Sequence, residues 1–250
     1  MRRSPLLSVN ASRWLVILLF LALLELAVRT DVINQLFVAH PSLTLWQMLQ
    51  DVVNGVFWLA LLTTLYEVAI AFFVATVLGV AIGYFLWKLP RIGQAYDPLL
   101  AGLFSSPIIL LYPIFLVIFG RNPSAVIALG TIMGILPVIL YTRQAFSGVS
   151  KTLLKVGMSM NLRSQDIFRH ILLPAAAPTI FTGLRLGLTY ILIGVVSMEY
   201  IVQIGGLGQV VAATYLRFRM NELYSSIGFV IILSVLFIYL TYRGEQAVRK

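Results

Sequence analysis

Six long apolar stretches constrain the fold of this chain more than any other feature of its sequence. A helix needs about 20 mostly apolar residues to cross the hydrocarbon core of a bilayer, whereas the strands of a membrane barrel alternate in segments of about ten. The stretches here are continuously apolar, which favours helices. They run over Trp14–Val28, Phe57–Trp87, Leu99–Phe119, Ser124–Tyr141, Pro178–Ile204 and Leu223–Tyr242. The sequence therefore predicts an all-α integral membrane protein with about six transmembrane helices.

The composition supports lipid as the solvent. Hydrophobic residues make up 60% of the chain and charged residues only 11%, against about a quarter charged in a soluble domain. The chain has no cysteine, and its two histidines, His40 and His170, lie far apart in sequence. These observations predict neither a disulfide framework nor a thiolate or histidine metal site. We expect no metal and no cofactor.

The basic residues predict the orientation of the chain. If the N-terminus is cytoplasmic, fourteen Lys and Arg residues lie on or reach the inner side and four lie outside. The four outer residues are Arg29, Arg121, Arg217 and Arg219. Because positive charge accumulates on the cytoplasmic side, both termini are predicted to be cytoplasmic. This placement explains the net charge of +9 without nucleic acid. We expect the first stretch to remain as an uncleaved helix, since no small-x-small signal-peptide cleavage site follows Glu25.

Among the segments that connect the spans, one on the inner side is long. Outside the membrane, Pro41–Val53 is predicted to form an amphipathic helix with Ser42 as its N-cap. A basic hinge at Lys88–Asp97 and a tight outer turn at Gly120–Pro123 are also expected. The long inner segment at 143–173 is polar, basic and predicted to be helical. Because loops of that length are usually functional, we expect this cytoplasmic segment to have a function. We assign residues 1–250 to a single transmembrane domain.

The long inner loop carries a motif. Asn161 stands ten residues before Ile171, and Lys155 stands six residues before Asn161. The loop then ends in Ile171-Leu172-Leu173-Pro174. This spacing resembles the "EAA" loop of ABC importer permeases, which reads Glu-Ala-Ala, three residues, Gly, nine residues, Ile-x-Leu-Pro. Ile171, Leu173 and Pro174 match the pattern, whereas Lys155-Val156-Gly157 replaces Glu-Ala-Ala and Asn161 replaces the glycine.

Further features extend the resemblance over about residues 40–242. It is strongest to the nitrate/sulfonate/taurine group of these permeases. The features occur in the family's order and include Asp97-Pro98, Gly183-Leu184-Arg185, Glu199 and Gly206-Leu207-Gly208. The resemblance implies a type I ABC importer permease fold in the bacterial inner membrane. It also implies two copies of an ABC ATPase, a second permease copy forming a homodimer, an external solute-binding protein, and a small solute such as nitrate, a sulfonate or taurine.

The resemblance assigns the loop to coupling with the ATPase. A short helix at about 163–170 is expected to lie in a groove of the ATPase, with Ile167 and Phe168 as apolar anchors and Arg163, Asp166 and Arg169 as rim charges. Pro174 is expected to stop this helix and redirect the chain into the fifth span. Asn161 is expected to adopt the positive φ that glycine would allow. The alternative is an amphipathic helix on the inner lipid surface.

Glu67 lies inside the predicted span Phe57–Trp87, and Glu199 lies inside Pro178–Ile204. A carboxylate in the membrane is costly, so Glu67 and Glu199 should face a cavity or a partner. We consider them, with Tyr112, Tyr190 and Met198, as candidates for the translocation pathway or gate; burial in helix packing is the alternative. Arg143 and Arg185 are expected near the inner mouth.

No phosphate-binding loop of the Gly-x-x-x-x-Gly-Lys-Ser/Thr type and no nucleophile motif occurs in the chain. Energy for transport must therefore come from another polypeptide, and we expect no enzymatic activity of the chain itself. The alternative functions are a self-contained secondary transporter or channel, which would usually show inverted repeats and a coupling-ion site, and a membrane scaffold.

Overall fold

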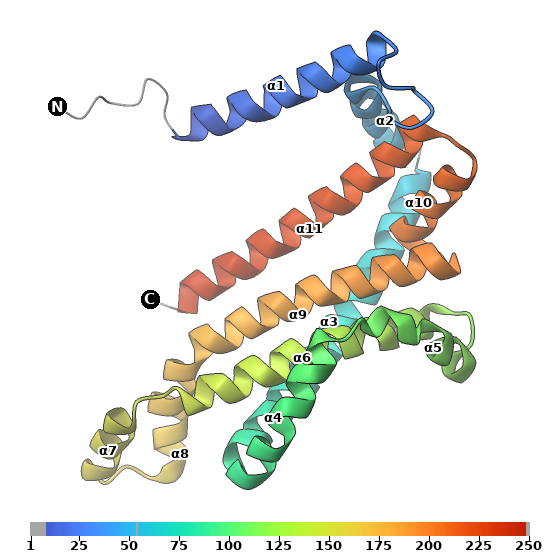
Figure 1. The fold of residues 1–250 in the computed structure, drawn as a ribbon. Helices are drawn as coiled ribbons and strands as arrows, with labels where there is room; N and C mark the ends of the chain where they lie inside the picture. Colours follow the sequence, from blue (N-terminus) through green and yellow to red (C-terminus); the bar gives the residue numbers. More distant parts are fainter. Residues whose placement is uncertain (1–8, 54, 249–250) are drawn as a thin grey trace, which may run out of the picture.

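The computed structural model describes residues 9–53 and 55–248, and nearly all of them are helical. No strand occurs among these residues (Figure 1). The elements are α1 (Val9–Arg29), α2 (Pro41–Val53), α3 (Val56–Lys88), α4 (Pro90–Ser105), the 3₁₀ turn η1 (Ile108–Leu111), α5 (Tyr112–Phe119), α6 (Pro123–Ser147), α7 (Lys151–Ser159), α8 (Ser164–Ile167), the π-helical turn η2 (Phe168–Leu172), α9 (Leu173–Val202), α10 (Gly206–Leu216) and α11 (Met220–Val248).

The predicted spans are confirmed with one correction. Five helical stretches of the described residues are long and apolar enough to cross a membrane, and a bent pair of helices brings the number to six. The expected span Leu99–Phe119 is not one continuous helix, because α4 and the helical segment Ile108–Phe119 meet at 85°. Ser106 is extended, as a residue before proline tends to be, and Pro107 has no N–H to continue the helix. The expected hinge at Lys88–Asp97 is also wrong, since Pro90 begins α4 directly after α3.

The centre of the bundle is formed by α3, α6 and α9. Small residues let these helices approach closely: a Cβ atom on Gly134 of α6 would lie 2.3 Å from the Ile191 side chain of α9, and one on Gly187 would lie 2.7 Å from Val138. Leu129, Ile191 and Val195 are completely buried around this contact. Close packing of this kind is typical of membrane helices, where glycine permits backbone-to-backbone approach.

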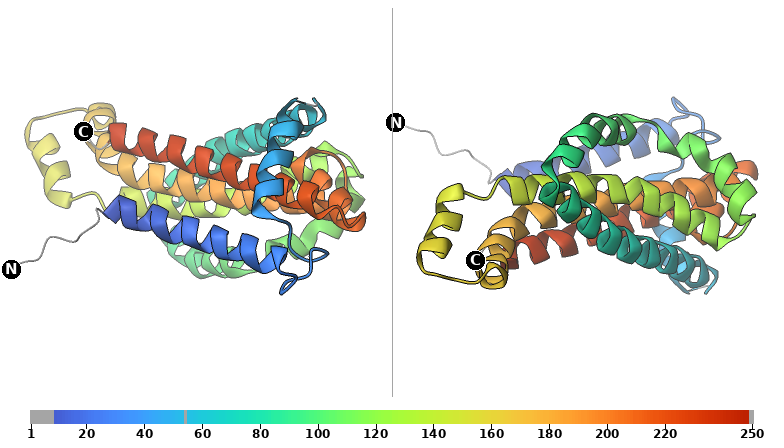
Figure 2. Two further views of the ribbon diagram at one scale, coloured as in Figure 1. Left: turned by 90° about the horizontal axis from the view of Figure 1, so that it is seen from above. Right: turned by 90° about the horizontal axis from the view of Figure 1, so that it is seen from below.

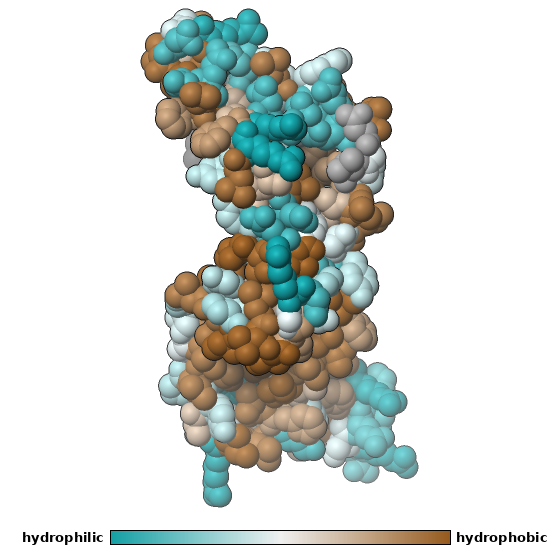
Figure 3. Space-filling model, turned by 90° about the vertical axis from the view of Figure 1, so that its right-hand side faces the viewer, coloured by the Kyte–Doolittle hydropathy of each residue, from teal (hydrophilic) through white to brown (hydrophobic). Residues whose placement is uncertain are grey.

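The outside of the bundle is apolar. On α1 even large apolar side chains such as Phe20 are exposed, at 64% of their surface, as expected for contact with lipid. The end of the molecule opposite α7 and α8 carries a broad hydrophobic area with hydrophilic residues gathered mainly above it (Figure 3). The start of α1 and the end of α11 lie at the same end as α7 and α8 (Figure 2). This arrangement agrees with the predicted orientation, and we call that end the inner end.

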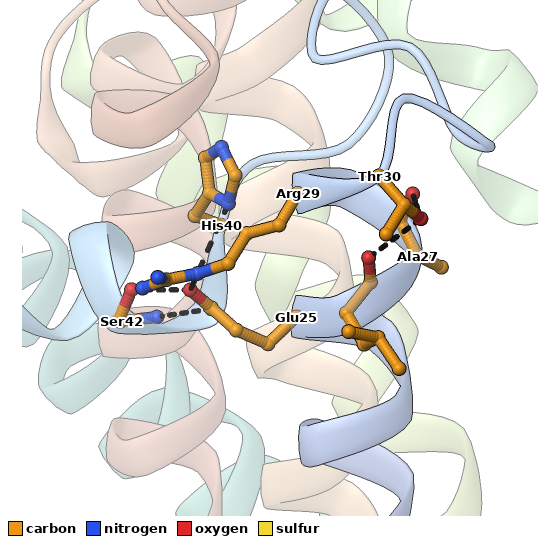
Figure 4. Close-up of polar contacts among 7 residues, drawn as sticks. Glu25, Ala27, Arg29, Thr30, His40 and Ser42 are labelled. Carbon is orange, nitrogen blue, oxygen red and sulfur yellow. Dashed lines mark hydrogen bonds and ion pairs between the residues drawn. The ribbon is translucent and has the colours of Figure 1, made fainter.

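A polar cluster joins α1 to α2 at the outer end. Glu25 accepts hydrogen bonds from Arg29 Nε at 2.8 Å, from the Ser42 N–H at 3.0 Å and from Ser42 Oγ at 2.7 Å (Figure 4). His40 Nδ1 lies 3.7 Å from the same carboxylate. Helix α2 has the predicted bounds, but Ser42 is not its N-cap. The helix already begins at Pro41, and the hydroxyl of Ser42 donates to Glu25 instead.

Candidate functional site

The long inner segment folds into two short helices that turn back on each other. Ser150 caps α7 at its start, since its Oγ accepts a hydrogen bond from the Thr152 N–H at 3.3 Å. Gly157 is buried where α7 meets the end of the segment: a Cβ there would lie 2.6 Å from the Ile171 side chain and 3.2 Å from that of Ile167. The glycine therefore allows α7 to pack directly against α8 and η2.

Asn161 forms the turn between these helices. Its φ is +56°; its N–H donates to the Met158 carbonyl at 3.0 Å, and the Leu162 N–H donates to the Gly157 carbonyl at 3.2 Å. These two bonds around a left-handed residue constitute a Schellman motif, which ends a helix and reverses the chain. The prediction that Asn161 takes the conformation of a glycine is confirmed.

Phe168 attaches the segment to the membrane helices. Its ring centroid lies 5.6 Å from that of Tyr84 on α3 and 6.3 Å from that of Phe146 on α6. Trp87 completes this aromatic cluster, 5.2 Å from Phe146. The expectation that Ile167 and Phe168 anchor the loop in a partner protein stays a prediction. Both are half-buried within the chain, because the apolar side of the segment is needed to hold it against α3 and α6.

The other predicted loop residues differ in exposure. Arg163 and Arg169 are exposed, Asp166 and Ile171 are half-buried, and Leu173 is 39% exposed. Pro174 does not stop a helix, contrary to expectation. The chain stays helical from Ser164 to Val202 through η2, and Pro174 lies in the first turn of α9, where its missing N–H is tolerated. The change of direction between α8 and α9 occurs at the π-helical turn (Figure 1).

A groove of about 710 Å³ opens between the inner end of α3 and this segment. Its apolar lining comes from Tyr84, Trp87 and Leu154, and its polar lining includes Lys88 and Arg169. The sequence analysis did not identify Tyr84, Trp87 or Phe146 as functional, although the aromatic residues at the end of the predicted span Phe57–Trp87 were a usable signal.

The structure brings the two intramembrane acids together with a threonine. Glu199 of α9 accepts hydrogen bonds from Thr64 Oγ1 of α3 at 2.7 Å and from the Gly208 N–H of α10 at 2.8 Å. Thr64 Oγ1 in turn accepts from the Leu207 N–H at 2.9 Å. Glu67 lies one turn after Thr64, and its Oε2 has no hydrogen-bond partner among the described residues.

This buried cluster holds the start of α10. Glu67 and Glu199 are 1% and 0% exposed, and the first N–H groups of α10 find their acceptors in Glu199 and Thr64, as the free N–H groups of a helix start require. Gly206 has a φ of +74°, and a Cβ on it would lie 2.0 Å from the carboxylate of Glu199. Glycine is therefore needed where α10 begins.

The remaining pathway candidates lie in the packed interior. Met198 is completely buried, Tyr190 is half-buried against Phe104 with ring centroids 4.9 Å apart, and Tyr112 is half-buried beside the central core. The structure does not bring these three into the cluster of Glu67 and Glu199. Their role in a pathway stays a prediction.

Two arginines expected at the inner mouth are held by carboxylates. Arg143 of α6 forms an ion pair with Asp97 of α4. Arg185 of α9 forms one with Glu245 of α11 at 3.1 Å. Each pair joins two helices near the inner end, so both arginines contribute to fastening the bundle there.

Comparison with known proteins gives consistent results at the level of family and fold. The family model described as "Binding-protein-dependent transport system inner membrane component" matches residues 75–248. The chain is 30% identical over 155 residues to the nitrate import permease protein NrtB of Leptolyngbya laminosa, covering 62% of this chain and 54% of that protein. It is 27% identical to the bicarbonate transport system permease protein CmpB of Synechocystis sp., covering 68% and 61%.

A third relative is the taurine transport system permease protein TauC of Escherichia coli, 25% identical over 71% of this chain and 66% of that protein. The chain thus matches only a little over half the length of the first two relatives. Among solved structures, the MetNI methionine ABC transporter, inward facing, matches with a TM-score of 0.67 at 21% identity, over 77% of this chain and 96% of that one. An amino acid ABC transporter matches with a TM-score of 0.64 at 16% identity, over 79% and 96%. The predicted fold of an ABC importer permease is confirmed.

Proposed function

The chain belongs to the family of binding-protein-dependent transport system inner membrane components, and we propose that it is the permease subunit of an ATP-driven importer. In this proposal residues 1–250 form one transmembrane permease domain, and the inner segment 143–173 is its coupling loop. The six spans would carry the solute path, and the loop would receive force from outside the lipid. The multi-pass helical structure supports this division of roles.

The observation that carries the proposal is the attachment of the loop to the bundle. Phe168 contacts α3 through Tyr84 and α6 through Phe146, and the same segment continues into α9. Because packed interiors resist compression, a push on α7 and α8 would move the inner ends of three spans together. A loop resting on lipid would have no need of such a connection to the central helices.

The energy and the partners would come from other chains. Two copies of an ABC ATPase would bind the coupling loops of two permease copies, which would form a homodimer, and an external binding protein would deliver the solute. ATP would be hydrolysed by the ATPase alone. The family description, which names an inner membrane component, supports a place in the bacterial inner membrane.

The solute is proposed to be small, with an anion among the candidates. The relatives are named for nitrate import and for bicarbonate and taurine transport. Burial of Glu67 and Glu199 in helix contacts, at 1% and 0% exposure, supports a path that an anion can use. Sulfonates are further candidates, because taurine, for which one relative is named, is a sulfonate.

The test is reconstitution in proteoliposomes with an ABC ATPase and a solute-binding protein of the same organism. Uptake of labelled nitrate, bicarbonate or taurine should require ATP, and deletion of residues 161–169 should abolish co-purification of the ATPase while the protein remains inserted. Flux through the chain alone, driven by an ion gradient, would instead support a secondary transporter or channel.

A further inference from the structure

The groove between the inner end of α3 and the inner loop continues into a second cavity, which is largely apolar. The second cavity has a volume of about 400 Å³. Tyr84 and Phe168 line both this cavity and the groove of about 710 Å³, so the two spaces adjoin at these rings. Val77 and Val80 of α3 and Leu173 of α9 contribute to the apolar walls of the second cavity. A groove with basic and aromatic lining is therefore followed by an apolar one.

The lining of the two cavities follows one face of α3. Val77, Val80, Tyr84 and Lys88 are three or four residues apart, which places them on one side of the helix. Thr76, at the far end of this lining, stands twelve residues before Lys88, which corresponds to about 18 Å along a helix. One leaflet accounts for half of a hydrocarbon core about 30 Å thick. Because Lys88 ends α3 at the inner end, the two cavities together extend over about the depth of the inner leaflet.

The groove carries positive charge without a carboxylate in its lining. Lys88 and Arg169 line it and are exposed, and neither forms an ion pair among the residues that the structure describes. Ser164 and Gln165 add neutral side chains that can donate hydrogen bonds. Asp166 is half-buried and does not line the groove. The groove is therefore suited to a negatively charged group that accepts hydrogen bonds.

We propose that the two cavities together bind one anionic phospholipid of the inner leaflet. The phosphate lies between Lys88 and Arg169, and an acyl chain runs along α3 past Tyr84 into the apolar cavity. Two cations without a carboxylate match a headgroup of net negative charge, such as that of phosphatidylglycerol. The ammonium of a zwitterionic headgroup, such as that of phosphatidylethanolamine, finds no carboxylate in this lining. The apolar cavity favours a lipid over a free phosphate ion, because an ion uses the groove alone.

The bound lipid connects the inner loop to the bundle. Lys88 belongs to α3 and Arg169 to η2, so a phosphate held by both joins the same two elements as the contact between Phe168 and Tyr84. This inference goes beyond the proposed function, because lipid binding requires neither the ATPase nor the solute.

The test is native mass spectrometry of the full chain, purified in detergent and titrated with phosphatidylglycerol, phosphatidylethanolamine and glycerol 3-phosphate. We expect phosphatidylglycerol to bind about tenfold more tightly than phosphatidylethanolamine, and an equal concentration of glycerol 3-phosphate to leave it bound. In Lys88→Gln/Arg169→Gln the affinity for phosphatidylglycerol should fall about tenfold or more, because both charges that attract the phosphate are removed. The matched control is Arg91→Gln/Lys151→Gln, which removes two exposed basic residues that line neither cavity. Its affinity should equal that of the unaltered chain.

A second pair of variants tests the acyl chain. Val77 lines the apolar cavity and is 51% exposed, so Val77→Trp fills the cavity without changing a charge. Its affinity for phosphatidylglycerol should also fall about tenfold. Leu78→Trp introduces the same ring at the next residue of α3, which is 47% exposed and lines neither cavity, and should leave the affinity unchanged.

Each arm of the experiment can overturn the proposal. Equal affinity of the unaltered chain for the two phospholipids, or full affinity of Lys88→Gln/Arg169→Gln for phosphatidylglycerol, would contradict a site for an anionic headgroup. Displacement by glycerol 3-phosphate, or full affinity of Val77→Trp, would replace the lipid site by one for a free phosphate group. None of these outcomes affects the proposed function, which the proteoliposome assay tests separately.

Discussion

The ring of Phe168 lies edge-on to the ring of Tyr84, with centroids 5.6 Å apart and planes at 74°. This contact joins the inner loop to α3 across 84 residues of sequence. Together with the contact between Phe168 and Phe146, it packs the loop against the membrane-spanning helices. Edge-to-face rings at this spacing attract each other by about 0.5–1.5 kcal/mol beyond their burial.

Replacing Phe168 by alanine should uncouple the loop from the bundle. We expect ATPase co-purification to persist, because the exposed face of α7 is untouched, whereas ATP-driven uptake should fall by about tenfold or more as the rigid connection is lost. The measurement is uptake per ATP hydrolysed in proteoliposomes. Phe73→Ala makes the same change at a side chain that is 68% exposed on α3 and should leave that ratio unchanged. Equal ratios in the two variants would contradict the rigid connection.

The hydroxyl of Thr64 serves two buried partners at once. Thr64→Val removes the donor to Glu199 and the acceptor for the Leu207 N–H while keeping the shape of the side chain. Each buried group left without a partner costs about 1–3 kcal/mol, so we expect a clear fall in melting temperature in detergent.

The control for this change is Thr142→Val. Thr142 is also completely buried, but its Oγ1 has no hydrogen-bond partner among the described residues. Valine there should leave the melting temperature unchanged or raise it. If both variants lost the same stability, the loss would come from packing, and the hydrogen bonds of Thr64 would not be the cause.

Gly206 should not tolerate a side chain. Gly206→Ala combines a φ of +74° with a Cβ placed 2.0 Å from the Glu199 carboxylate, so the start of α10 must move away from α9. We expect faster hydrogen exchange of the Leu207 and Gly208 amides and a stability loss of about 1–3 kcal/mol. Gly102→Ala, where a Cβ would meet no atom within 4 Å, should change neither; normal exchange at both amides in Gly206→Ala would contradict the described cluster.

Asn161 tests the turn of the coupling loop. Asn161→Gly should preserve the loop, because glycine adopts a φ near +56° without steric cost. Asn161→Val should destabilise the turn by about 1–2 kcal/mol, because left-handed geometry brings its Cβ too close to the following carbonyl. Limited proteolysis between α7 and α8 measures the difference; similar cleavage of the two variants would argue against a left-handed residue here.

The elements that were predicted correctly are those determined by residues close together in the sequence. The amphipathic helix Pro41–Val53 has the expected bounds, and α3 closely follows the expected span Phe57–Trp87. The turn at Gly120–Pro123 was expected from its composition, and Gly120 takes a φ of +77° there. Continuous apolar length and turn residues act within a few positions of the chain, so they can be recognised without knowing the tertiary structure.

The features that were not predicted depend on contacts between distant segments. The 85° bend after α4 depends on how the rest of the bundle accommodates the backbone carbonyls that lose a helical hydrogen bond near Pro107. The presence of a proline alone does not specify this bend. Which way Phe168 points depends on Tyr84 and Phe146, far away in sequence. The sequence analysis identified Glu67 and Glu199 as costly acids, but their meeting requires the alignment of α3 with α9 that places Thr64 and Glu199, 135 residues apart, in contact.

The most direct test of the coupling role is a cross-link from the inner loop in intact membranes. The chain has no cysteine, and Met160 is 67% exposed, so Met160→Cys provides one attachment point for a photoactivatable maleimide. We predict an adduct with the nucleotide-hydrolysing subunit, and reaction with an impermeant maleimide only from the cytoplasmic side. Labelling of Met160→Cys from the outside of intact cells, or adducts with lipid alone, would contradict the account.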